Sequence, residues 1–355
     1  MENNRRKSKS VRVGTLMLGG DAPIAVQSML NTDSHDAEAC IRQTQALTAA
    51  GCDIVRLAVP DIAAARTFAV MKERGVTVPL VADIHFDYKI ALEAAACGAD
   101  KIRINPGNIG DDERVRAVVN ACREKGLPIR IGVNSGSLEK HILAKYGAPT
   151  AEALAESAMY HVALLEKFDF TDIVISIKAS TVREMIRANR ILAEKCEYPL
   201  HLGVTEAGTV HTGTVKSAAG IGSLLCDGIG DTIRVSLTAD PVQEVVEGHT
   251  ILRALGLEDN GIDLVSCPTC GRTQIPLIDM VAEFERRMPE LHPSRRVKVA
   301  MMGCIVNGPG EAREADIGIA GGKSEAVLFR HGEIVKKIPA SEAVDILINE
   351  IKEMG

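Results

Sequence analysis

The chain has 355 residues and a mass of 37.9 kDa, which is long enough for two domains, one of them a full-size α/β barrel. Its net charge of −6, its aromatic content of 3% and its lack of tryptophan argue against binding to nucleic acid or to an anionic membrane surface. No stretch reaches the roughly 18 apolar residues of a membrane-spanning helix, and an odd count of nine cysteines disfavours an oxidising compartment. We therefore expect a cytoplasmic protein that binds neither nucleic acid nor membranes.

Short runs rich in β-branched residues recur along residues 1–256. These runs are 24–28, 54–59, 80–84, 101–105, 129–133, 173–177, 200–204 and 232–236. Helical patterns separate them, as at 37–50, 63–74 and 111–125. Strand–helix alternation indicates a parallel sheet covered by helices, and the number of units predicts a closed (β/α)8 TIM barrel. The alternative, an open doubly wound sheet, would be unusually large and would lack the third glycine of a dinucleotide fingerprint.

Segments before and after the barrel pattern complete the predicted α/β organisation. Residues 11–27, with a turn at Gly19-Gly20-Asp21, predict a hairpin at the start of the barrel domain. Residues 257–261 have the composition of a linker. Beyond it, predicted strands at 262–266, 297–302 and 316–320, a helix at 274–287 and a hairpin at 327–338 indicate a small α+β domain over 262–355.

Polar residues alternate with apolar ones near the ends of the predicted strands. Since residues i and i+2 of a strand point the same way, the polar series faces into the barrel, where barrel enzymes place their sites. The cations that converge there are Arg56, Arg103, Arg130, Lys178 and Arg234. The carboxylates that we can place beside them, Asp83 and Glu206, are too few to neutralise all of them, although internal ion pairs could satisfy some. The missing charge is most simply a ligand that carries phosphate or diphosphate.

Three cysteines stand apart from the other six, which we expect to be small buried apolar residues. Cys267 and Cys270 form a Cys-x-x-Cys pair, and Cys304 lies in a second glycine-rich loop. This pattern places three thiolates around one metal centre. The fourth ligand is then another residue, a substrate or water. A zinc site completed by His292 or Glu311, on a phosphate-binding barrel, is one alternative; an electron carrier with the barrel as scaffold is another.

Several long motifs together resemble one family, the 4-hydroxy-3-methylbut-2-enyl diphosphate synthases of the methylerythritol phosphate route to isoprenoids. They include Cys267-Pro-Thr-Cys-Gly-Arg272, Gly303-Cys-Ile-Val-Asn-Gly-Pro-Gly-Glu311, Val81-Ala-Asp-Ile-His85 and Asp227-Gly-Ile-Gly-Asp-Thr-Ile-Arg-Val-Ser236. The resemblance implies an iron–sulfur oxidoreductase that opens the ring of 2-C-methyl-D-erythritol 2,4-cyclodiphosphate with two electrons. It also implies a ferredoxin or flavodoxin as electron donor.

The resemblance further implies roles for individual residues. A [4Fe–4S] cluster would be held by Cys267, Cys270, Cys304 and Glu311. Glu206 would supply a proton, with Asp83 as the second candidate for that role, and Asn307 would orient the substrate. The diphosphate would be held by Arg56, His85, Arg103, Arg130, Asn134, Lys178, Thr205, Arg234 and Ser236.

The predicted geometry also favours a homodimer. The helix expected at 241–255 returns the chain to the barrel end opposite the mouth, over about 22 Å. A linker of five residues reaches at most about 17 Å. We therefore expect each cluster domain to cover the barrel mouth of a neighbouring copy, which gives a C2 homodimer with shared sites.

Overall fold

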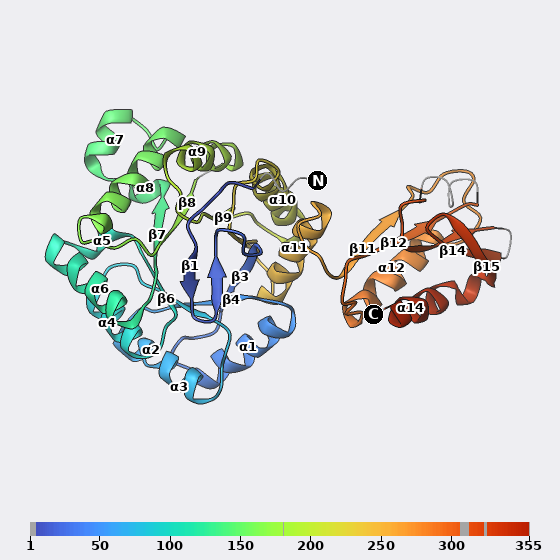
Figure 1. Ribbon diagram of the computed structural model, residues 1–355, viewed down its shortest axis with the longest axis horizontal. Coiled ribbons are helices and arrows are strands. Elements are labelled where there is room, and N and C mark those ends of the chain that lie inside the picture. The colour runs from blue at the N-terminus through green and yellow to red at the C-terminus, as the bar shows by residue number, and fades with distance from the viewer. Residues whose placement is uncertain (1–4, 180, 306–311, 323–324, 355) are drawn as a thin grey trace. The chain divides into compact units, whose positions relative to one another are not determined.

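A computed structural model of the chain describes residues 5–179, 181–305, 312–322 and 325–354 (Figure 1). The chain divides into two compact units, Met1–Ile251 and Leu252–Gly355, and each is described by itself. Among the helices within those ranges, none is long and apolar enough to cross a membrane.

The first unit is built on an eight-stranded parallel sheet. Its strands follow the order β8-β7-β6-β5-β4-β3-β10-β9, and a parallel bridge between Ile175 and Leu200 joins β8 to β9. The predicted TIM barrel is thus confirmed, with each predicted strand present to within a few residues. The strands are β3 (Ala25–Met29), β4 (Ile54–Ala58), β5 (Leu80–Asp83), β6 (Lys101–Ile104), β7 (Ile129–Asn134), β8 (Ile173–Lys178), β9 (His201–Gly203) and β10 (Thr232–Arg234).

Helices surround this sheet (Figure 1). They are α1 (Ala37–Ala49), α2 (Ile62–Ala65), α3 (Thr67–Glu73), α4 (Tyr88–Ala96), α5 (Pro106–Ile109), α6 (Asp112–Lys125), α7 (Lys140–Tyr146), α8 (Ala151–Glu166), α9 (Val182–Lys195), α10 (Val210–Cys226) and α11 (Pro241–Ala254), with a 3-10 turn at Ser135–Ser137. Several begin after an aspartate whose carboxylate accepts a backbone N–H of the first turn, which satisfies a donor that the helix itself leaves open. These N-caps are Asp36, Asp61, Asp87 and Asp111.

The hairpin before the barrel differs from the one predicted over 11–27. Strand β1 (Val11–Val13) pairs antiparallel with β2 (Leu16–Leu18), and the turn uses Gly14, whose φ is +57°. The prediction of a turn at residues 19–21 was wrong because Ala25–Met29 pairs with β10 and β4 inside the barrel instead. The hairpin packs its apolar side chains against inward residues at the N-terminal ends of the barrel strands: Ala25, Ile54, Val81 and Val174. It therefore closes that end of the barrel.

The second unit is a five-stranded sheet with helices, as the sequence predicted. In it β11, β12 and β13 are parallel, while β14 and β15 add antiparallel to β13. Its core joins sheet residues to apolar residues of both helices, among them Phe284 and Leu347, which are fully buried. The elements are β11 (Ile262–Ser266), α12 (Leu277–Arg287), β12 (Val297–Met302), β13 (Ile317–Gly321), β14 (Glu325–Arg330), β15 (Glu333–Pro339) and α14 (Ala343–Met354), with 3-10 turns at Met288–Glu290 and Ala340–Glu342.

The hairpin contact predicts a measurable loss of stability. Leu18 is fully buried, so replacing it by alanine leaves a cavity, and we expect the free energy of unfolding to fall by about 2–5 kcal/mol. Urea denaturation measures this change. The neighbouring Met17→Ala removes a side chain that is 43% exposed and serves as the control, with an expected change within about 0.5 kcal/mol. Equal effects of the two variants would show that the hairpin does not seal the barrel.

Candidate functional site

The C-terminal ends of the barrel strands surround a polar hollow. Six strands contribute to it, and its lining is cationic or hydroxyl-bearing apart from one histidine and one glycine. The lining residues are Arg56, Arg103, Arg130, Ser176, Lys178, His201, Gly203, Thr205, Arg234 and Ser236. The structure therefore brings together the five cations that strand alternation had placed at the mouth. Thr205 and Ser236, which were expected to help hold the ligand, line the same hollow.

Asp83 fixes two of the arginines. Its carboxylate is buried and accepts from Nη2 of Arg56 and from Nη1 of Arg103, the latter at 2.9 Å. Burial alone would raise the pKa of Asp83, but the two guanidinium groups hold it well below its ordinary value. Asp83 is therefore a permanent anion that orients the forks of Arg56 and Arg103.

Glu244 plays the same part for Arg234, and sequence reasoning missed it. Its carboxylate is buried, lies 3.3 Å from Nη2 of Arg234 and accepts from the Ser28 hydroxyl at 2.8 Å. It comes from the first turn of α11 rather than from a strand, so strand alternation could not reveal it. The only signal was an acidic residue shortly after Pro241, at the start of the helix that follows β10. Even with Glu244, the five cations outnumber the carboxylates that pair with them in the described part of the chain.

Lys178 shows what this imbalance does to an ionisable group. Burial and the nearby charges of Arg56 and Arg103 lower the pKa of Lys178 from its ordinary value to about 7. Several donors around it, including Nε of Arg56 and Nε of Arg130, have no hydrogen-bond partner in the part of the chain that the structure describes. Unpaired buried donors and an excess of positive charge are the features of a site built for an anion.

The remaining predicted residues lie at the rim or outside the described ranges. His85 is exposed on the loop after β5, with Nε2 3.5 Å from Nη1 of Arg103. Asn134 ends β7 as the neighbour of Lys178 across the ladder, but it does not line the hollow. Glu206 is exposed beside Thr205 and has φ +55°, a left-handed conformation that is unusual for a residue with a side chain. Asn307 lies outside the described residues.

A glycine makes room for one of the arginines. A Cβ atom added to Gly132 on β7 would lie 2.5 Å from Nε and from Nη2 of Arg103. Because real Cβ atoms do not come this close to other atoms, Arg103 keeps its position only while residue 132 has no side chain.

The three cysteines lie on loops that follow two neighbouring parallel strands. Cys267 comes directly after β11 and Cys304 shortly after β12, and Ser266 pairs with Met301 in the ladder between them. The amide of Gly303 donates to Sγ of Cys267 at 3.2 Å, which joins the two loops. Hydrogen bonds from Arg272 lower the pKa of Cys270 and so favour its thiolate, the form that binds metal.

This donor set fits an iron–sulfur cluster, whose protein ligands are mostly thiolates. Within the described ranges, no three His, Cys, Asp or Glu residues are close enough to hold one ion. Cluster ligands need not be so close, because iron and sulfide atoms lie between them. His292 precedes β12 whereas Cys304 follows it, and a strand of six residues separates its ends by about 20 Å, which argues against His292 as the fourth ligand. Glu311 lies outside the described residues.

The six other cysteines differ among themselves. Cys40, Cys52 and Cys122 are buried as predicted, and burial raises the pKa of Cys52 and of Cys122 to about 12. Cys97 and Cys196 are half-buried. The prediction of a buried Cys226 was wrong, because this residue ends α10 on the exposed side of the helix.

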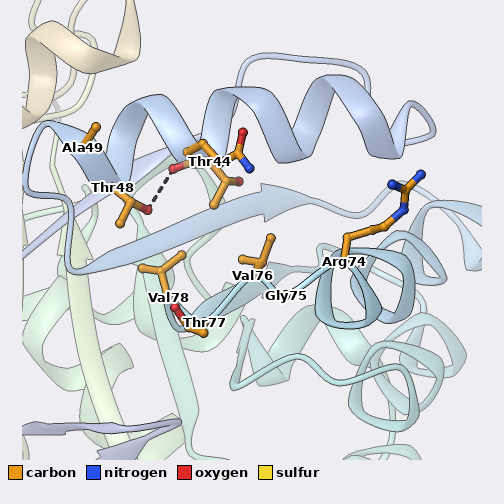
Figure 2. A pocket seen from close by; sticks show the side chains of 9 residues that line it. Thr44, Thr48, Ala49, Arg74, Gly75, Val76, Thr77 and Val78 are labelled. Carbon is orange, nitrogen blue, oxygen red and sulfur yellow. Dashed lines mark hydrogen bonds between the residues drawn. The ribbon is translucent and has the colours of Figure 1, made fainter.

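A second hollow lies at the other end of the barrel strands, between α1 and the segment that leads into β5 (Figure 2). Thr44, Thr48, Val76 and Val78 line it, and the Thr48 hydroxyl donates to the backbone of its own helix. The guanidinium of Arg74 points away and pairs with Glu38 at 2.6 Å. None of the predicted site residues lies there.

Comparisons with known proteins identify a family. A family model described as the GcpE TIM-barrel domain matches residues 8–249, and one described as the GcpE protein C-terminal domain matches residues 263–353. The chain is 58% identical to a protein of Ruminiclostridium cellulolyticum and 56% identical to one of Geobacter sulfurreducens, covering 99% of this chain and 98% of each relative. Both relatives are named 4-hydroxy-3-methylbut-2-en-1-yl diphosphate synthase (flavodoxin).

Solved structures match the barrel. Type I 3-dehydroquinate dehydratase from Clostridium difficile has a TM-score of 0.52 and 13% identity, covering 70% of this chain and 98% of its own. Dihydropteroate synthase from Thermus thermophilus has a TM-score of 0.50 and 14% identity, covering 70% and 99%. At such low identity, these likenesses show the fold alone.

The close approach of residue 132 to Arg103 yields a prediction. Gly132→Ala displaces the guanidinium, and the loss of a charged hydrogen bond costs about 1.5–3 kcal/mol, so inorganic diphosphate should bind about tenfold to a hundredfold more weakly. Titration calorimetry measures the affinity. Gly222→Ala in α10 is the control, since its Cβ would meet no atom within 4 Å outside its own helix and neighbours. Equal affinities for the two variants would argue against Arg103 as a ligand of the anion.

Proposed function

Because the chain belongs to the GcpE family of 4-hydroxy-3-methylbut-2-enyl diphosphate synthases, we propose that it reduces 2-C-methyl-D-erythritol 2,4-cyclodiphosphate to 4-hydroxy-3-methylbut-2-enyl diphosphate. The reaction consumes two electrons and a proton, opens the ring and releases one oxygen as water. The observation that carries this proposal is the cationic hollow, whose positive charge exceeds that of its paired carboxylates.

The cations of the hollow would bind the diphosphate. Guanidinium forks bind phosphate oxygens in pairs, and Asp83 and Glu244 already hold Arg56, Arg103 and Arg234 in fixed orientations. Ser236 and Thr205 add hydroxyl donors at the rim. Preorganised groups lose little entropy when the ligand arrives, so the binding energy is available to position the ring.

The proton source would be Glu206 rather than Asp83. The two guanidinium groups keep Asp83 ionised, so it holds no proton to give. Glu206 lies beside Thr205 at the rim, and its left-handed backbone fixes the direction of its side chain. His85 and Asn134, both at strand ends, would contact the substrate from the same rim, and Asn307 would orient it.

Cys267, Cys270 and Cys304 would hold a [4Fe–4S] cluster, with Glu311 as its fourth ligand. When bound, this cluster supplies single electrons and a Lewis-acidic iron for the departing oxygen. The chain's own contribution is to keep thiolates available, through the hydrogen bonds to Cys270 and the Gly303 amide on Cys267. The names of the relatives support flavodoxin as electron donor, with ferredoxin as the other candidate, and the cytoplasm is the location that we propose.

We also propose a homodimer in which each cluster domain covers the barrel mouth of the partner subunit. Helix α11 starts at the end of the barrel that carries the hollow and runs back toward the opposite end, where it leads into the segment before β11. The domains on which this proposal rests are the barrel at 1–256, the linker at 257–261 and the cluster domain at 262–355.

Anaerobic purification tests the proposed activity. We expect about four irons and four sulfides per chain in a brown protein, and turnover of the cyclodiphosphate with reduced flavodoxin. Cys304→Ala should lose both the iron and the turnover, whereas Cys226→Ala, an exposed cysteine on the barrel, should retain both. A colourless protein with one zinc per chain and no turnover would refute the proposal.

Mixing two inactive variants tests the shared site. Cys267→Ala disables the cluster domain and Arg130→Gln disables the barrel, so a mixed dimer would contain one intact site. After subunit exchange, an equal mixture should regain about a quarter of wild-type activity. A mixture of Arg130→Gln with Lys178→Met, both in the barrel, should remain inactive. If the first mixture also stays inactive, each chain completes its own site.

A further inference from the structure

A lysine lies beneath the hollow without lining it. Lys101 begins β6, two residues before Arg103, so its side chain points into the barrel one step below that arginine. It is 0% exposed, and its Nζ has no hydrogen-bond partner among the described residues. A fully buried lysine without a partner is rare, since an ammonium group in such a place loses its hydration without compensation.

Among the described residues, the charged groups that act on Lys101 are cations. Arg56 on β4 and Arg130 on β7 act on it electrostatically. His201 lies on β9, and its pKa is lowered by burial first and then by the charges of Arg130 and Lys101. Nδ1 of His201 lies 2.5 Å from Oγ1 of Thr232. On β5, Asp83 is engaged with Arg56 and Arg103.

These surroundings determine the charge of the amine in the free protein. Burial, followed by the repulsion from Arg130 and Arg56, lowers the pKa of Lys101 well below its ordinary value. The same causes act on His201, whose pKa is also lowered. A neutral amine keeps its lone pair, so Lys101 can accept a hydrogen bond or a proton, which no arginine around it can do.

We propose that Lys101 is a positioning residue of the diphosphate site, an amine that is uncharged in the free protein and takes up a proton when a diphosphate binds above it. The proposal rests on the proposed function, because it requires an anion in the hollow. The proton comes from the solvent and bonds to the lone pair of Nζ, and no electrons are transferred. Lys101 acts through Arg130 and Arg56, which both act on it electrostatically and both line the hollow.

The physical reason is the change in field that the ligand causes. In the empty site, a charged Lys101 would add to the mutual repulsion of Arg56 and Arg130. A bound diphosphate reverses the local potential and makes a further positive charge favourable. Lys178 should behave in the same way at the rim: with a pKa of about 7 in the free protein, it loses its charge above that pH and regains it when the anion binds. Affinity for the diphosphate therefore falls as the pH rises above 7.

Proton uptake on binding tests the proposal. Calorimetric titrations of the holoenzyme with the cyclodiphosphate at pH 8, in two buffers of different ionisation enthalpy, give the number of protons bound with the ligand. The two phosphate hydroxyls of the cyclic diphosphate are strongly acidic and its alcohol hydroxyls do not ionise near pH 8, so the uptake belongs to the protein. Linkage gives about 0.9 proton for Lys178 at this pH, and the proposed protonation of Lys101 adds one more. Lys101→Met should lower the uptake by about one proton, and Lys125→Met, an exposed lysine of α6, should leave it unchanged.

The outcomes separate this proposal from the proposed function. If the wild type binds the cyclodiphosphate and Lys101→Met takes up as many protons as the wild type, the role of Lys101 is refuted and the function stands. If the cyclodiphosphate does not bind at all, the proposed function is refuted. The charge of Lys101 is then measured in the free wild-type protein. Carbon-13 NMR of its lysine ε-carbons at pH 8 should show neutral amines at Lys101 and Lys178. A spectrum with only charged lysines would refute the proposal without any variant.

Discussion

The positive charge inside the barrel is the constraint on which the rest of the site depends. Guanidinium groups from β4, β6, β7 and β10 converge on one hollow, and each would be costly to bury alone. Carboxylates neutralise only part of this charge: Asp83 forms ion pairs with two of the arginines, and Glu244 forms one with a third. The carboxylates are placed where they orient the arginines, and the donors that face the hollow are left open. An incomplete offset costs stability, but under the proposed function it is what would give the site affinity for an anion.

The barrel and its cations were predictable from the sequence because both follow from a period of two residues. A strand that is apolar on its outer face and polar on its inner face reveals which side chains face inward, and β6, β7 and β8 all show this pattern. The three cysteines stand out for a different reason. A Cys-x-x-Cys pair and a third cysteine between glycines have no role in a helix face or a strand core, so the sequence predicts that they are metal ligands, and that stays a prediction.

Other features were not predictable, and each has a physical reason. Glu244 comes from a helix, and its partners Arg234 and Ser28 belong to different strands, so nothing in the local sequence shows the contact. The predicted position of the hairpin turn was wrong because Gly14, Gly19 and Gly20 all have positive φ and can all form a turn. Only the packing of Leu18 under the barrel decides which of them does so. Lys101 and Arg103 occupy the same face of β6, so the sequence alone does not distinguish them. That Lys101 lies deeper in the barrel follows only from the three-dimensional arrangement of the strands.

The same charge imbalance gives the two lysines a property that the arginines lack. A diphosphate that binds in the hollow makes the local potential more negative, and ionisable groups nearby can respond to that change. Arginines cannot adjust, because they remain charged at all accessible pH values. Lysines with a lowered pKa can adjust, since they gain a proton as the local potential becomes more negative. A site that combines fixed guanidinium groups with titratable amines would therefore hold the anion in a defined orientation and adjust its own charge as the anion binds. Under this proposal, positions 101 and 178 carry lysine rather than a further arginine because only an amine can change its charge in this way.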